Sequence, residues 1–186
     1  MAIEAGDFKT GLTVMVDGDP WVVVDFIHVK PGKGAAILKT KMKNLKTGST
    51  QERNFNASTK FDAATIEKKR ATFSYVSDGT YYFMDNETYD TYELTEEHIG
   101  FNKYFLLEGM EIMLVFFEGN VLDISLPDKV EVTLVECEQA VKGDTATNAL
   151  KNAVTETGLK VKVPMFIENG ERIIVSTADG KYVSRA

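Results

Sequence analysis

The chain has 186 residues and a formal net charge of −7, with 44% hydrophobic and 26% charged residues, as in ordinary soluble globular proteins. No apolar run approaches the roughly 20 residues that span a bilayer, and the first residues lack the basic and apolar regions of a signal peptide. The single cysteine, Cys137, excludes an intramolecular disulfide and a cysteine-cluster metal site. We therefore expect a cytoplasmic protein that does not bind membranes. We also expect a monomer.

The charge is unevenly distributed along the chain. Residues 1–64 carry nine Lys/Arg against seven Asp/Glu, residues 65–128 carry four against thirteen, and residues 129–186 carry eight against eight. The first third is thus +2 and the middle third −9. A polyanion could bind the first third, while the acidic middle third would face solvent or a basic protein surface.

The first third predicts a small barrel of the SH3 type. Short segments with period-two hydrophobicity are separated by tight turns, which is typical of strands in small barrels. We expect these strands near Thr13–Val16, Trp21–Lys30, Ala35–Asn44 and Gln51–Asn56.

Between the second and third of these strands lies a glycine-built loop, Lys30-Pro31-Gly32-Lys33-Gly34. Its two glycines can both adopt positive φ, and Lys33 has no bulky neighbour, so its amine should project from the domain. Two interpretations are open at this point. Lys33 is either a solvated tip residue or an amine that is delivered to a distant target or carries a covalent group.

The strand after this loop carries three alternating lysines, Lys39, Lys41 and Lys43, on one face. This row is either a solvated outer face or a stripe that follows a phosphate backbone without reading its sequence.

The middle third predicts an OB-type barrel with one short helix. Thr95-Glu96-Glu97, followed by apolar residues, is typical of a helix with an acidic first turn. The many aromatic residues are better explained as barrel filling than as a base-stacking platform, because an acidic domain repels nucleic acid. We expect strands near Ala71–Val76, Tyr81–Met84, Tyr89–Leu94, Glu111–Phe117 and Val121–Leu126.

The last third has similar length and strand content, which suggests a second OB-type barrel. Strands are expected near Lys129–Glu138, Leu159–Val163 and Arg172–Ser176, with a polar loop from Lys142 to Asn148 and a final hairpin at Asp179-Gly180. No strand is assigned to residues 151–158, which follow the polar loop. The sequence thus predicts an all-β chain of three small barrels, with domain limits 1–64, 65–128 and 129–186.

Residues for catalysis are missing from the sequence. His28 and His98 lie in different blocks, and neither a phosphate-binding glycine loop nor a nucleophile elbow is present. We expect no catalytic residue, no metal and no cofactor, so the protein is not an enzyme. Binding, or carriage of a group on Lys33, remains.

Three motifs in order resemble the elongation factor P family of bacteria, relatives of translation initiation factor five-A, over the whole chain. The first is the loop around Lys33 with the basic strand after it. The second is Gly143-Asp144-Thr145-Ala146. The third runs from Glu156-Thr157-Gly158 through Val163-Pro164-Met165-Phe166-Ile167 to the end at Ala186. Asn152 and Val154 depart from the pattern that the family usually shows.

The resemblance implies an L-shaped, tRNA-like arrangement of three barrels that binds the ribosome beside peptidyl-tRNA and relieves stalling at consecutive prolines. Lys33 would then be a modified lysine near the end of peptidyl-tRNA, with Lys30, Pro31, Gly32 and Gly34 facing that tRNA. A lysine-modifying enzyme would be a further partner. Gly143, Asp144 and Thr145 would face the small subunit and codon, and Tyr182 and Arg185 are further candidates for tRNA contacts.

Two other functions stay open. A carrier domain would bear its group on a lysine at a hairpin tip, but it leaves two barrels unexplained. A generic ribosome- or RNA-binding module would use the loop only structurally.

Overall fold

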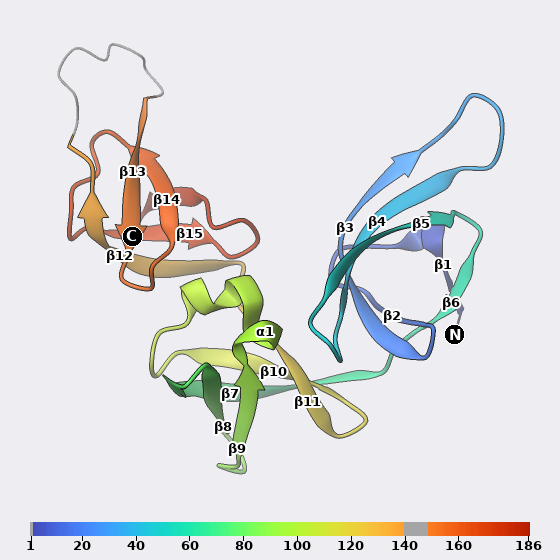
Figure 1. The fold of residues 1–186 in the computed structure, drawn as a ribbon, viewed down its shortest axis with the longest axis horizontal. Coiled ribbons are helices and arrows are strands. Elements are labelled where there is room, and N and C mark those ends of the chain that lie inside the picture. Colours follow the sequence, from blue (N-terminus) through green and yellow to red (C-terminus); the bar gives the residue numbers. More distant parts are fainter. Residues whose placement is uncertain (1, 140–148) are drawn as a thin grey trace.

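The structure is a computed structural model that describes residues 2–139 and 149–186. Antiparallel strands form three lobes in chain order, and Figure 1 shows the middle lobe at a corner from which the other two extend as arms. This confirms the predicted all-β fold of three small barrels. Within the described residues, none of the helices is both long and apolar enough to cross a membrane.

The first lobe is a four-stranded sheet in the order β2-β3-β4-β5, closed by a short strand pair. That pair, β1 with β6, was not predicted, because three-residue strands are too short to show periodicity. A bridge between Val14 and Ala63 joins the pair to the sheet. The elements are β1 (Ala2–Glu4), the 3₁₀ turn η1 (Ala5–Asp7), β2 (Thr13–Val16), β3 (Asp19–Val29), β4 (Ile37–Asn44), β5 (Thr50–Asn56) and β6 (Lys60–Asp62).

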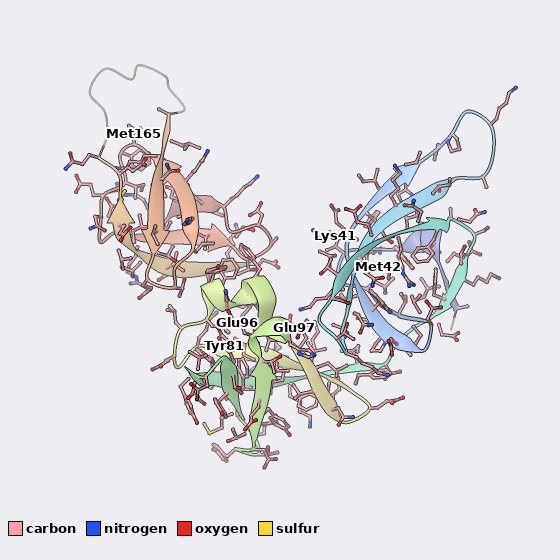
Figure 2. All side chains as sticks on the ribbon, viewed as in Figure 1. Lys41, Met42, Tyr81, Glu96, Glu97 and Met165 are labelled. Carbon is pink, nitrogen blue, oxygen red and sulfur yellow. The ribbon has the colours of Figure 1, made fainter. Side chains whose placement is uncertain are left out.

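Alternation along β4 orients its side chains as predicted. Leu38 and Met42 are fully buried in the barrel core, together with Val14, Val23 and Trp21. Lys39 and Lys41 are exposed on the opposite face. Figure 2 shows Lys41 and Met42, which are adjacent in the chain, on the outer and inner sides of the strand.

The second lobe is a five-stranded sheet in the order β11-β10-β7-β8-β9. The predicted helix is present as α1, and it continues directly into a 3₁₀ helix, η2. The bounds are β7 (Ile66–Ser77), β8 (Thr80–Asp85), β9 (Thr91–Thr95), α1 (Glu96–Ile99), η2 (Gly100–Phe105), β10 (Glu111–Phe117) and β11 (Asn120–Ser125).

The aromatic residues of this lobe divide into two groups. Phe73, Tyr81 and Phe83 are buried in its core, as expected for barrel filling. Tyr75 on β7 and Tyr82 on β8 instead stack on each other away from the core, with ring centroids 4.6 Å apart, and Tyr75 is exposed.

The third lobe repeats the same strand order. Its sheet runs β14-β13-β12-β15-β16, which is the order of the second lobe with the helix left out. The strands are β12 (Lys129–Cys137), β13 (Leu150–Thr155), β14 (Lys160–Pro164), β15 (Arg172–Ser176) and β16 (Tyr182–Arg185). Strand β13 was not predicted, because its inward positions are occupied by Lys151, Ala153 and Thr155 instead of large apolar residues.

Candidate functional site

The hairpin of β3 and β4 projects from the first lobe and carries the predicted loop at its tip (Figure 1). The two strands pair from Trp21 with Asn44 up to Val29 with Ile37. Most of β3 beyond Val23 is exposed, including Ile27, whose side chain is 62% accessible. The tip loop is therefore held by strand pairing, because the half of β3 next to the loop extends beyond the barrel core.

The loop conformation leaves Lys33 exposed to solvent. All residues from Lys30 to Ala35 are exposed. Gly34 has a φ of 112°, in the region that favours glycine, whereas Gly32 has an ordinary negative φ, so only one of the two glycines uses the freedom expected of them. Apart from the glycines' own chain neighbours, no described atom lies within 4 Å of where a Cβ would stand on either glycine. Lys33 is thus flanked by empty space on both sides.

The basic row on β4 is less uniform than its sequence indicates. Lys39 and Lys41 share the exposed face, but the cross-strand neighbours of Lys41 are Asp25 and Glu52. Neighbouring carboxylates weaken the local positive potential, which is what a phosphate stripe would need.

Lys43 makes contacts with the second lobe that its sequence pattern does not indicate. Its Nζ donates to Asp123 Oδ2 of β11 at 2.9 Å and to the carbonyl oxygen of His98 at 3.0 Å. Both partners belong to the second lobe. Of the three lysines in the predicted row, only Lys39 and Lys41 are therefore exposed, because the Lys43 amine is held by the second lobe.

Burial raises the pKa of Asp123, and the nearby Lys43 amine opposes this shift. The side chains of Lys43 and Asp123 are only 18% and 10% exposed, so the pair is largely removed from water. An ion pair in such surroundings has to be well aligned to offset the desolvation of two charges.

Around this pair, the β4–β5 turn packs against α1. His98 Nε2 lies 2.8 Å from the carbonyl oxygen of Lys46, and its Nδ1 lies 3.0 Å from Thr95 Oγ1. A Cβ on Gly48, whose φ is 77°, would come within 3.1 Å of the carbonyl oxygen of Glu97. His98 is therefore a satisfied polar residue, as predicted, but its place in a contact between lobes was missed. The one available signal was Asp123, an acidic residue within an apolar strand.

On the other side, η2 inserts into the third lobe. Phe105 is fully buried in the core of the third sheet, and Thr157 Oγ1 donates to the carbonyl oxygen of Tyr104. Gly180, with φ 72°, passes so close to η2 that a Cβ there would lie 2.9 Å from Phe101 Cζ. The segment from Glu96 to Phe105 thus contacts both arms.

The predicted residues of the third lobe are only partly visible. Gly143, Asp144 and Thr145 lie outside the described residues. Tyr182 is half-buried against the core, and Arg185 makes two hydrogen bonds to the Glu171 carboxylate, at 2.9 and 3.0 Å, with its guanidinium over the Phe166 ring. The Arg185 guanidinium lowers the pKa of Glu171. Within residues 2–139 and 149–186, no cluster of three potential metal ligands exists.

Three family models match the chain one after another. The model described as Elongation factor P (EF-P) KOW-like domain matches residues 4–61, the Elongation factor P (EF-P) OB domain matches residues 66–124, and Elongation factor P, C-terminal, matches residues 130–185.

Two solved structures are also similar. Eukaryotic translation initiation factor 5A from Methanococcus jannaschii is 25% identical, with a TM-score of 0.48, over 67% of this chain and 94% of that chain. A translation initiation factor eif-5a family protein from Naegleria fowleri ATCC 30863 is 16% identical, with a TM-score of 0.41, over 68% and 98% of the two chains.

Proposed function

Because the chain belongs to the elongation factor P family, and is therefore a translation factor, we propose that it binds the ribosome beside peptidyl-tRNA and stimulates peptide-bond formation at consecutive prolines. In this proposal residues 1–64 reach the reacting end of the tRNA, residues 65–128 form the corner, and residues 129–186 approach the small subunit. The three domains together would occupy the space of a tRNA.

The observation that carries this proposal is the exposed Lys33 at the tip of a projecting hairpin, with open space around both neighbouring glycines. A lysine that only kept a turn soluble would not need such a support. The same geometry suits a covalent extension of the amine, so we propose Lys33 as the target of a lysine-modifying enzyme.

The proposed mechanism is positional. Proline is a rigid and poor nucleophile, so most of its barrier in peptide-bond formation is one of alignment. Ordering two reactants recovers up to about 7–11 kcal/mol in the most favourable cases, without an acid or a base. A cationic tip among tRNA phosphates, in a site with little free water, adds electrostatic stabilisation. Lys33 would therefore act by holding the end of peptidyl-tRNA, with Lys30 and Pro31 beside it.

The test is a purified translation system without this protein, with a polyproline reporter and a proline-free reporter. Wild-type protein purified from its own host, which keeps any modification, should restore the polyproline product. Lys33→Ala should not restore it. Lys60→Ala, which removes an exposed lysine of the same barrel far from the tip, is the matched control and should behave as wild type.

The outcomes separate the proposal from its alternatives. No rescue by the wild type would refute the role at proline stalls. Ribosome binding without rescue would instead indicate a generic ribosome-binding module, and absence of ribosome binding at physiological salt would favour a carrier domain. Intact mass of the native protein reports the modification, and full activity of the unmodified protein would remove the extension from the mechanism.

A further inference from the structure

The ion pair between Lys43 and Asp123 crosses from the first lobe to the second at the base of the β3–β4 hairpin. A buried ion pair is a weak source of stability, because desolvation of the two charges consumes much of their attraction. The pair instead restricts the orientation of the first lobe relative to the second, because it forms only over a narrow range of orientations. Lys43 is at the end of β4 that lies farthest from the tip loop.

Three polar contacts surround this point and come from different directions. The Lys43 amine donates to Asp123 on β11 and to the carbonyl oxygen of His98 at the end of α1. The His98 ring reaches back to the carbonyl oxygen of Lys46 in the turn after β4. Gly48 provides the close approach of that turn to α1. Contacts in several directions restrict rotation as well as separation.

The same segment is also anchored on its other side. After α1 the chain continues into η2, where Phe105 is buried in the third core and the carbonyl oxygen of Tyr104 accepts from Thr157. The position of α1 is therefore fixed by the corner of the molecule and not only by its contact with the first lobe.

We propose that Lys43 and Asp123 are positioning residues that set the direction in which the β3–β4 hairpin presents Lys33. The proposal rests on the function proposed above. Without the pair, the first lobe still folds around its own core, but it samples a wider range of orientations against the second lobe. Only a fraction of molecules is then ready to bind, which raises the apparent dissociation constant in inverse proportion to that fraction.

The first experiment measures the orientation of the two lobes directly in the isolated 186-residue chain. Spin labels are placed by Ser58→Cys on the first lobe and Glu87→Cys on the second, both exposed, in a Cys137→Ala background. The distance distribution should broaden in Lys43→Met and in Asp123→Asn. The matched control is Arg53→Met, which removes the ion pair of Arg53 with Asp17 within the first lobe, affects none of the described contacts with α1, and should leave the distribution unchanged.

The double variant Lys43→Met/Asp123→Asn separates orientation from stability. It leaves no lone buried charge, so it should unfold at a temperature closer to that of the wild type than Lys43→Met does. Its distance distribution should remain broad. Recovery of the narrow distribution in the double variant, or an unchanged distribution in Lys43→Met, would overturn the proposal.

The second experiment titrates each variant in the polyproline assay. The Lys43 and Asp123 variants should need about three- to tenfold more protein for half-maximal stimulation, with the maximum retained. Lys33→Ala should lower the maximum itself. A broadened distribution with an unchanged half-maximal concentration would contradict the positioning role. Failure of the wild type to stimulate would refute the proposed function. The distance measurement would still test whether Lys43 and Asp123 fix the orientation of the first lobe against the second.

Discussion

Phe105 connects the second and third lobes, and its truncation should lower the stability of only one of them. The side chain belongs by sequence to η2 of the second lobe, but it is 0% exposed and packs in the core of the third sheet with Val132, Ile167 and Ile173. Phe105→Ala should therefore destabilise the third lobe and leave the sheet of the second lobe nearly unchanged.

The magnitude follows from the burial of the ring. A buried phenylalanine removes about 150–250 Å² from water, and truncation of such a residue to alanine costs about 3–5 kcal/mol. A domain the size of the third lobe has a total stability of about 3–8 kcal/mol. The loss is comparable to this total, so the third lobe should unfold in a substantial share of molecules at ambient temperature.

The assay is amide hydrogen exchange resolved by segment. Protection should fall across β12, β13 and β15, remain in β7 and β10, and leave the fluorescence of Trp21, the single tryptophan, unchanged. Phe101→Ala is the matched control, because this neighbouring ring is 46% exposed and should cost about 1–2 kcal/mol. Equal loss of protection in both sheets, or no loss in the third, would refute the reasoning.

Two further predictions concern the loop and the acid stability of the corner. Gly34→Ala should reduce maximal stimulation about threefold or more, since its φ of 112° suits only glycine, whereas Gly32→Ala should be tolerated; equal effects would contradict the assigned loop geometry. The backbone N–H groups of Thr88 and Glu87 lower the pKa of Asp85 below its ordinary 3.8, so the stability it contributes is fully present above that value and is lost as pH falls from there through the lower pKa of the folded state. In urea unfolding at a series of pH values, Asp85→Asn should show a shallower loss of stability below about pH 4, and a slope equal to that of wild type would refute this.

Short apolar runs bounded by turn residues could be predicted as strands from the sequence. The structure confirms the predicted bounds of three of them, Thr13–Val16, Glu111–Phe117 and Arg172–Ser176, because each run is rich in apolar residues and is flanked by a glycine- or aspartate-containing turn. The strand Leu150–Thr155 could not be predicted, because Lys151 occupies a buried position whose pattern looks like solvent-facing sequence.

The candidate site likewise contains features that the sequence predicts and features that it does not. The exposed tip of Lys33 depends on local turn chemistry, which the sequence contains. The pairing of Lys43 depends on Asp123, which follows it in the chain by 80 positions, and no local pattern indicates such a partner. Alternation places Lys43 on the same face as Lys39 and Lys41, but it does not reveal that a neighbouring lobe covers that end of the strand.

The length of β4 turns a small rotation at the base of the hairpin into a larger displacement at its tip. From Lys43 to Ile37, next to the tip loop, the strand spans about 20 Å at about 3.3 Å per residue. A rotation of about 5° at the base would then move the far end by about 2 Å over that span. Misplacement of a reacting group by about 1 Å can cost about 100-fold in rate. In the proposed function, the angular precision of the tip is therefore set at the end of β4 that lies farthest from the tip loop.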